Sequence, residues 1–269
     1  MIYDSANRKH PAIEEFLALF RYRDFIYQLV RRDIVARYKR SILGIAWTML
    51  NPLGTMLIMV VVFSRVFNAV QNYPAYVLTG LICWAMFSQS TSHSISMMVW
   101  GSRLIQQIYL PKTAFIVSTV IASMVNFLLS LVPLFIILAI TKTALGWSIV
   151  LLPFSMILIL LFSLGVSLLI STLAVFFPDV EQMYPVVLTG WMYMSPIIVP
   201  LEFLENVLNG WLLRLNPFYH VLNIFRIIMY KGGVPTGQDW AFALLVSFGA
   251  LIIGWYIFTR KADSMTYYV

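Results

Sequence analysis

Six apolar segments, each close to the length that crosses a lipid bilayer, constrain this 269-residue chain more than any other feature. A helix rises about 1.5 Å per residue, so roughly 20 apolar residues cross about 30 Å of hydrocarbon. Only 11% of the residues are charged and 61% are hydrophobic, which excludes a water-soluble globule. We therefore expect an all-α integral membrane protein with six transmembrane helices. The predicted spans are about 44–67, 73–99, 113–141, 147–175, 184–200 and 240–259.

The basic residues indicate on which side of the membrane the ends of the chain lie. Nine of the 18 Lys and Arg residues precede Gly44. With six crossings, the start of the chain, the loop between the second and third spans, and the tail share one side, and this side holds 13 of the 18. Cytoplasmic loops carry the excess of Lys and Arg in membrane proteins. We expect both termini in the cytoplasm.

Two shorter apolar segments, 201–215 and 218–230, lie between the fifth and last spans and are separated by an Asn-Pro pair. Fusing them into one span would bury Arg214 and Arg226 in the membrane and would move the basic tail to the other side. We expect instead a re-entrant helical hairpin, about 201–230, that enters from the outer face. Such backbone is tolerated where protein or a watery cavity covers it. Two helices lying in the outer interface are the alternative.

The chain is read as a single domain, because no repeat or long linker divides it. Residues 1–43 form a basic head, and residues 44–269 form the six-span transmembrane domain. Between 13 and 38, apolar residues recur at helical spacing among charged ones, which predicts an amphipathic helix along the cytoplasmic interface. That helix is either a membrane anchor only or a docking surface for a soluble partner.

The spans contain no Asp or Glu, and this argues against coupling to protons or sodium ions, since such carriers use intramembrane carboxylates. The chain also lacks a phosphate-binding loop. Residues 232–237 have its glycine spacing, but Gln238 and Asp239 follow where Lys and Ser or Thr are needed. Motifs for hydrolysis are missing, and Cys83 is the single cysteine. We expect no catalysis, metal or cofactor in this chain, so its energy must come from a separate subunit.

Polar residues within the spans are read as packing groups. His93 and Asn126 are expected to make hydrogen bonds between helices. Ser163, Ser167 and Ser171 recur every four residues on one helix face, which predicts a closely packed seam.

The entry to the first span resembles that of ABC-type polysaccharide export permeases. The residues that carry this resemblance are Asp33, Arg37, Tyr38, Lys39, Ser41, Leu43, Gly44, Trp47, Asn51 and Pro52. The loop 101–112 is similar to the family's loop between spans two and three. Ser195-Pro196 and Asn216-Pro217, followed by Arg226, resemble further landmarks. The resemblance to this family, the type 2 ABC exporters of O-antigen and teichoic acid, covers nearly the whole chain.

The resemblance implies a permease subunit of an ATP-driven exporter that moves a lipid-linked, O-antigen-like polysaccharide out of the cytoplasm across a bacterial inner membrane. Two copies of an ATP-binding subunit would hold ATP and magnesium, and the permease would form a homodimer surrounded by membrane lipids. A symmetric pair suits this task, because six helices alone do not readily enclose a path for a hydrated sugar chain. No nucleic acid partner is expected. The residues expected to contact the ATP-binding subunit are Arg31, Arg32, Asp33, Arg37, Tyr38, Lys39, Arg103, Leu104, Ile105, Tyr109 and Lys112.

Aromatic residues make up 15% of the chain and can pack against the C–H faces of sugars. Those near the predicted membrane surfaces, such as Trp100 and Trp147, fit the interfacial belts of membrane proteins. The candidates for lining a substrate pathway are Trp84, Phe87, Tyr184, Trp191 and Tyr193. Packing between helices is the alternative for each of them.

Three other functions stay open. The chain could be a permease for another lipid-linked glycan, such as teichoic acid, or for a small hydrophobic molecule. It could also be a membrane enzyme that acts on a lipid-linked intermediate, although no constellation of polar residues supports such chemistry.

Overall fold

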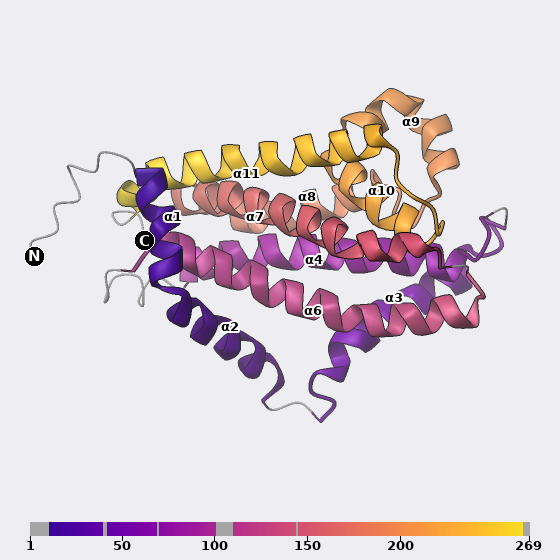
Figure 1. The fold of residues 1–269 in the computed structure, drawn as a ribbon, viewed down its shortest axis with the longest axis horizontal. Coiled ribbons are helices and arrows are strands. Elements are labelled where there is room, and N and C mark those ends of the chain that lie inside the picture. Colours follow the sequence, from indigo (N-terminus) through magenta and orange to yellow (C-terminus); the bar gives the residue numbers. More distant parts are fainter. Residues whose placement is uncertain (1–10, 40–41, 69, 101–109, 144, 266–269) are drawn as a thin grey trace, which may run out of the picture.

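The computed structural model describes residues 11–39, 42–68, 70–100, 110–143 and 145–265, and its regular structure within these ranges is entirely helical (Figure 1). The long helices run side by side as a bundle, with α1 and α2 at one end and α9 and α10 towards the other. The predicted all-α fold is confirmed. The helices are α1 (Pro11–Arg21), α2 (Arg23–Tyr38), α3 (Ala46–Phe63), α4 (Tyr73–Trp100), α6 (Lys112–Ile140), the short 3-10 helix η2 (Trp147–Leu151), α7 (Leu152–Phe176), α8 (Asp179–Tyr193), α9 (Leu201–Leu215), α10 (Pro217–Met229) and α11 (Gly237–Met265).

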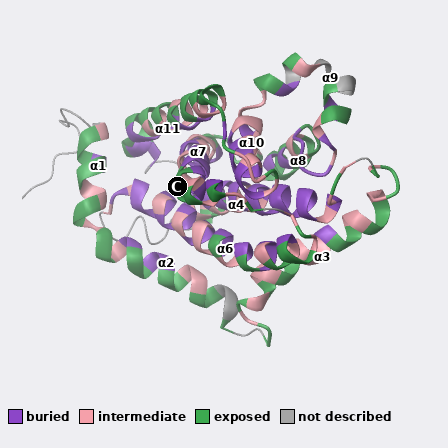
Figure 2. Ribbon diagram, turned by 45° about the vertical axis from the view of Figure 1, so that its right-hand side comes forward, coloured by how far each residue is buried: buried purple, intermediate pink, exposed green. Residues whose placement is uncertain are grey.

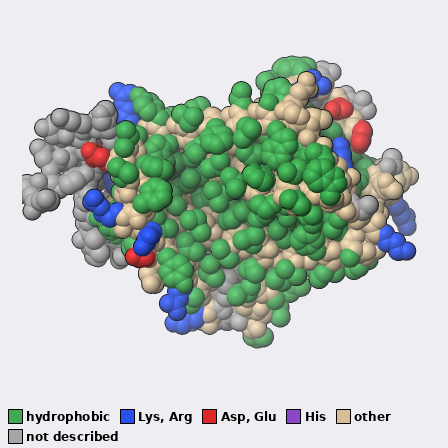
Figure 3. All heavy atoms as spheres, viewed as in Figure 1, with side chains coloured by type: hydrophobic (Ala, Val, Ile, Leu, Met, Phe, Trp, Pro, Cys, Tyr) green, Lys and Arg blue, Asp and Glu red, His purple; other side chains and the backbone are tan. Residues whose placement is uncertain are grey.

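Four helical segments are long and apolar enough to cross a membrane: α3, α6, η2 with α7, and α11. Each corresponds to one of the six predicted spans. Figure 3 shows a broad band of hydrophobic side chains across the viewed face, with charged side chains gathered at its two ends. The outer face of α3 illustrates this, because Leu57, Ile58 and Val61 are all more than half exposed. Such a surface suits lipid rather than water.

Helix α4 is 28 residues long, but it has no 18-residue stretch as apolar as those in the four candidate spans. It lies at the centre of the bundle, where α3, α6, α7, α8 and α10 pack around it, and 18 of its residues are buried (Figure 2). Protein therefore surrounds its hydroxyl side chains. Ser94 Oγ lies 3.0 Å from Thr119 Oγ1 of α6, a hydrogen bond between the two helices. A helix shielded in this way does not need the composition of a lipid-facing one.

Helix α8 differs from the predicted span 184–200. It begins at Asp179 and ends at Tyr193, so its 15 residues measure only about 22 Å. The Ser195-Pro196 pair explains the end, because proline restricts the residue before it and lacks an N–H donor. Residues 194–197 form a turn instead, and residues 198–200 are irregular. The buried carbonyls of this segment accept hydrogen bonds from α4, including Tyr76 Oη to Pro196 O at 3.0 Å.

Helices α9 and α10 begin and end close to the positions predicted for the two short apolar segments. Asn216 separates α9 from α10, and its side-chain oxygen accepts a hydrogen bond from the Phe218 backbone N–H at 3.1 Å. Pro217 occupies the first turn of α10, where its missing N–H has no helical partner to lose.

The predicted amphipathic run 13–38 forms two helices rather than one, because the chain turns at Tyr22 between α1 and α2. Helix α2 packs against α6 through Ile26 and Val30, which contact a cluster that includes Ala114 and Ala122.

Helix α1 joins the ends of two long helices. Thr113 Oγ1 at the start of α6 donates to Glu15 Oε2 at 2.6 Å, and Trp255 Nε1 of α11 donates to the Ala12 carbonyl at 3.2 Å. The beginning of the described chain and the last part of α11 therefore lie at the same end of the bundle.

Helices α7 and α11 approach each other so closely that their backbones touch. A Cβ atom added at Gly254 would lie 2.1 Å from the Gly165 carbonyl oxygen. Ser163, Ser167 and Ser171 on α7 are fully buried, which confirms that this stripe is a packed face.

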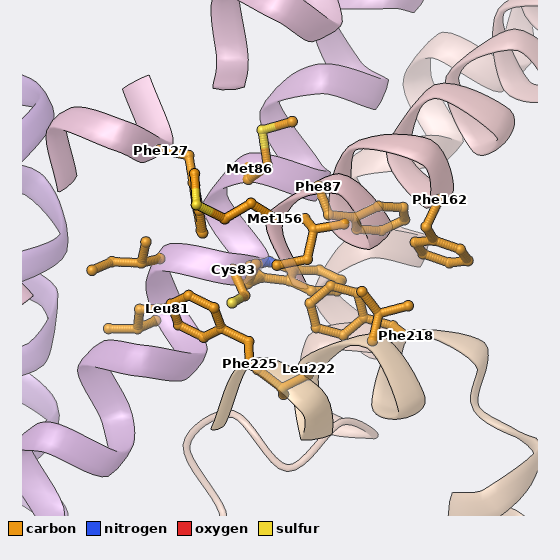
Figure 4. Close-up of a cluster of buried hydrophobic side chains, with 14 of the residues drawn as sticks. Leu81, Cys83, Met86, Phe87, Phe127, Met156, Phe162, Phe218, Leu222 and Phe225 are labelled. Atoms are coloured by element: carbon orange, nitrogen blue, oxygen red, sulfur yellow. The ribbon is translucent and has the colours of Figure 1, made fainter. Parts of the chain in front are cut away.

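The hydrophobic core fills the centre of the bundle. Cys83 lies within this core and is fully buried, beside side chains of α4, α6, α7 and α10 (Figure 4).

Candidate functional site

A partly open cavity of about 500 Å³ lies between α3, α4 and α6, with Met192 of α8 at its edge. Its lining combines the rings of Trp47, Trp84 and Phe127 with neutral polar groups, and none of its lining residues is a Lys, Arg, Asp or Glu. Amides and hydroxyls both donate and accept hydrogen bonds, so the cavity suits an uncharged, hydroxyl-rich ligand. The polar lining residues are Thr48, Asn51, Thr55, Ser88, Gln89, His93, Ser123, Asn126 and Ser130.

The wall formed by α3 depends on the Asn51-Pro52 pair. Pro52 has no N–H, so it cannot donate to the Thr48 carbonyl four residues earlier. Ser130 of α6 supplies a donor to that carbonyl, with its Oγ 3.2 Å away. The same hydroxyl lies 2.9 Å from the Asn126 carbonyl, so its proton is shared between two acceptors. Because of the proline, a backbone carbonyl of α3 depends on a side chain of α6 for its hydrogen bond at the edge of the cavity.

Two amide side chains join the other walls. Asn126 Nδ2 of α6 donates to Gln89 Oε1 of α4 at 3.4 Å, which confirms the expected interhelical hydrogen bond of Asn126. His93 lies one turn further along α4 and also lines the cavity. The sequence prediction treated these polar residues as packing groups only and missed the cavity. The available signal was the concentration of amides and hydroxyls in spans otherwise rich in apolar residues.

Three of the predicted pathway residues pack together within the subunit. The Phe87 ring centroid lies 5.0 Å from that of Trp191, and the Trp84 centroid lies 6.3 Å from Trp191. Phe162 and Phe218 complete the cluster, and Figure 4 shows their rings beside Phe87. Trp84 borders the polar cavity as well, so it belongs to both the cluster and the cavity lining.

The other two pathway candidates differ in exposure. Tyr184 is 5% exposed on the inner side of α8, whereas Tyr193 at the end of that helix is 51% exposed. Trp191, between them, is partly buried, and its Nε1 donates to Asn216 Oδ1 at 2.8 Å. Of the five candidates, only Tyr193 is exposed on the surface of the subunit.

The residues predicted to contact an ATP-binding subunit lie at the α1–α2 end of the bundle where the structure describes them. Arg31, Arg32 and Lys39 are exposed, and Asp33 is partly exposed. Lys112 starts α6, and its Nζ donates to the Ala262 carbonyl near the end of α11. Arg103, Leu104, Ile105 and Tyr109 lie outside the described residues, as do the side chains of Arg37 and Tyr38.

From the sequence, Arg226 was treated as a family landmark and as a charge that should stay out of the membrane. The structure buries Arg226 inside the protein, whereas Arg214 is exposed. Its guanidinium stacks over the Tyr76 ring and donates to the Pro196 carbonyl at 2.5 Å. Beside it, burial raises the pKa of the Tyr230 hydroxyl, and the nearby Arg226 charge acts in the opposite direction. The group therefore stays protonated at neutral pH and donates to the Gln71 carbonyl.

Known proteins are similar to this chain over most of its length. The profile of the family described as ABC-2 type transporter matches residues 25–230. The chain is 30% identical to an O-antigen export system permease protein of Myxococcus xanthus over 223 residues, which cover 82% of this chain and 85% of that protein. It is 26% identical to an O-antigen export system permease protein of Klebsiella pneumoniae, over 78% of this chain and 81% of that protein.

A polysialic acid transport protein of Escherichia coli is 23% identical over 250 residues, which cover 88% of this chain and 93% of that protein. The family profile extends from within α2 to the end of α10, and this range includes the residues of the polar cavity and of the aromatic cluster. The match thus covers the structural core of the chain rather than a single motif. This chain belongs to the ABC-2 type transporter family.

Proposed function

We propose that this chain is the membrane-spanning permease subunit of an ATP-driven exporter for a lipid-linked, O-antigen-like polysaccharide. The match to O-antigen export permeases along about four-fifths of the chain carries this proposal. ATP and magnesium would be bound by a separate ATP-binding subunit. The permease would lie in a bacterial inner membrane and would provide the route for the substrate.

In the membrane, α4 and α8 would supply two crossings beyond the four apolar helices, which gives six. The length of α4 and its central position support its crossing, while α8 would need residues 194–200 to complete its path. The basic head supports a cytoplasmic position for both termini. Helices α9 and α10 would then lie at the outer face as a re-entrant hairpin, and α1 and α2 would rest on the cytoplasmic surface.

The exporter would contain two permeases and two ATP-binding subunits. Exposed Arg31 and Arg32 on α2, together with the loop 101–112, would meet the ATP-binding subunit. The bonds from α1 to Thr113 of α6 and Trp255 of α11 support a mechanical role, because a push on the head would reach both long helices. Nucleotide state would then bias the permease between two discrete packings.

The substrate route would run along the face where two copies meet. The exposed ring of Tyr193 and the polar cavity between α3, α4 and α6 offer the two kinds of contact that sugars use: apolar ring faces and neutral hydrogen-bonding groups. The packed rings of Phe87, Trp191 and Trp84 would support the wall from behind.

The test is export in cells. The chain is expressed together with an ATP-binding subunit encoded beside it, in a host that lacks its own O-antigen export permease but still synthesises the lipid-linked polymer. We expect the polymer to reach the cell surface, as detected by antibody labelling of intact cells. A partner subunit whose catalytic Glu is replaced by Gln serves as the control and should leave the polymer inside.

Surface polymer in cells without any ATP-binding subunit would contradict the proposal. Normal ATP-dependent export of a small hydrophobic dye without export of polymer would instead assign the chain to the small-molecule alternative.

A further inference from the structure

The end of the bundle that carries α9 and α10 contains a buried positive charge, the guanidinium of Arg226. Arg226 is 5% exposed, and none of the described carboxylates lies within ion-pair distance of it. Its Nη1 donates to the Pro196 carbonyl at 2.5 Å and to Tyr76 Oη at 3.2 Å, and its Nη2 donates to the Tyr76 carbonyl at 3.3 Å. Its Nε, also buried, has no hydrogen-bond partner.

These contacts stabilise the guanidinium without neutralising it. Carbonyl oxygens and the Tyr76 ring face, 3.9 Å from the guanidinium carbon, direct partial negative charge towards Arg226. A whole charge removed from water remains costly unless an opposite charge comes close. The Arg226 guanidinium also lies close to the backbone of α4, because a Cβ atom added at Gly80 would lie 2.9 Å from Arg226 Nη2. A glycine on α4 thus makes room for the Arg226 guanidinium.

Arg226 lines a cavity of about 370 Å³ between α4, α9 and α10. Lys231, five residues further along the chain, lines the same cavity and is exposed to solvent. Tyr219 and Asn223 of α10 add neutral polar groups, and exposed Glu202 of α9 is the one acidic residue in the lining. Two cations against one carboxylate leave the cavity positive.

A second cavity of about 420 Å³ shares Gln71, Tyr230 and Lys231 with the first. Lys142, at the turn after α6, lines it. The hydrogen bond from the Tyr230 hydroxyl to the Gln71 carbonyl joins two residues common to both cavities. The positive region therefore extends from the buried Arg226 to the surface.

We propose that the Arg226 cavity binds a phosphate group. A planar guanidinium inside, an ammonium at the rim and neutral donors beside them match the several oxygens and the charge of a phosphate. The source is either the headgroup of a membrane lipid or free inorganic phosphate. Exposed Phe203 on α9 directly follows Glu202 of the cavity lining, and it is an apolar side chain that an acyl chain would contact. This inference does not depend on the proposed export function, because binding needs neither ATP nor transport.

The test uses the full-length chain, purified in a non-ionic detergent and stripped of lipid. Dioctanoyl phosphatidic acid is titrated in one arm, dioctanoylglycerol, which lacks the phosphate, in a second, and inorganic phosphate at constant ionic strength in a third. Native mass spectrometry counts lipid adducts, and the melting temperature reports binding in every arm. We expect one saturable phosphatidic acid adduct and a raised melting temperature, with no such effect from dioctanoylglycerol.

Variants of the lining residues test whether the ligand binds in this cavity. Lys231→Gln should weaken binding about two- to fivefold and Glu202→Gln should strengthen it by a similar factor, since both groups are exposed and act through a screened charge. Arg226→Gln should weaken binding about tenfold or more. Arg214→Gln is the matched control, because Arg214 is an exposed arginine of α9 that does not line the cavity.

Two results would overturn the proposal: dioctanoylglycerol binding as tightly as phosphatidic acid, or Lys231→Gln and Glu202→Gln both leaving the affinity unchanged. If Arg226→Gln does not fold, Lys231→Gln and Glu202→Gln still test whether the cavity is the binding site. A response to inorganic phosphate with the same dependence on the variants would support the site and identify free phosphate as its source. A response to phosphatidic acid alone would identify a lipid.

Discussion

Ser130 on α6 donates a hydrogen bond to the Thr48 carbonyl on α3, the carbonyl that Pro52 leaves without a helical donor. This pairing explains why an Asn-Pro sequence is tolerated in the middle of a lipid-facing helix. The neighbouring α6 replaces the missing bond, and the polar cavity begins at the same point. Helix α3 is therefore tied to the bundle by a polar contact as well as by apolar packing.

Replacing this donor tests the relationship. Ser130→Ala should destabilise the protein by about 1 kcal/mol, because the Thr48 carbonyl loses its donor. In a Pro52→Ala background the new N–H of residue 52 can supply that bond, so the cost of Ser130→Ala should fall by about half or more. The double-mutant cycle is measured from the melting temperatures, in detergent, of the unmodified protein, the two single variants and the double variant. Ser118→Ala is the control, since that hydroxyl bonds only the Phe115 carbonyl of its own helix. Equal costs in both backgrounds would argue that the two residues are not coupled.

The contact between α7 and α11 predicts opposite effects for two glycines of one helix. Gly254→Ala should destabilise the protein by about 1–3 kcal/mol or more, because its Cβ would lie 2.1 Å from a backbone oxygen of α7. Gly249→Ala should be neutral or stabilising by up to about 1 kcal/mol, since no atom lies within 4 Å of its added Cβ and alanine favours helix. Thermal unfolding in detergent measures both. Similar melting temperatures for the two variants would mean that α11 can move away from α7 at little cost.

Two aromatic residues of α8 allow a packing role to be distinguished from a role in the substrate pathway. Trp191→Ala should lower stability by about 3 kcal/mol, because its ring packs against Phe87 and its Nε1 bonds Asn216. Tyr193→Ala should change stability by less than about 0.5 kcal/mol, since this residue lies exposed at the end of α8. If Tyr193 borders the substrate route, its replacement should still slow polymer export in the cell assay. Unchanged export by a stably folded Tyr193→Ala protein would remove that residue from the proposed route.

Charge reversal on the head tests the contact with the ATP-binding subunit. The triple change Arg31→Glu, Arg32→Glu and Arg37→Glu should reduce co-purification of that subunit while membrane insertion continues, because the spans are unaltered. Reversing Lys142 and Arg214, which lie towards the opposite end of the chain's bundle, provides the comparison and should leave co-purification intact. Normal recovery of the partner with the triple variant would place the contact elsewhere.

Local sequence signals were sufficient for much of the fold. The Asn216-Pro217 pair marks the boundary between α9 and α10, because asparagine caps and proline starts a helix. Long apolar runs predict α3, α6, α7 and α11, because a helix that faces lipid needs an apolar surface along its length. The turn at Tyr22 carried no such signal, and the periodicity on either side of it continued, so one amphipathic helix was predicted where two form.

Other features depend on contacts between distant segments. The buried position of Arg226 requires Gly80, Tyr76 and the turn at Pro196, which come together only in the folded bundle. For the same reason, the polar cavity could not be read from α4 or α6 alone. The aromatic residues of the proposed pathway were chosen by type and depth, but ring contacts within the subunit involve three of them.

The burial of Cys83 has a practical consequence. Because the chain's single thiol is sealed inside the core, maleimide reagents should leave the unmodified protein unlabelled, and new cysteines can be introduced without first deleting the native one. Cysteines placed at Lys142 and at Arg260 would then show, by their reactivity in intact cells and in inverted vesicles, which end of the bundle faces which compartment.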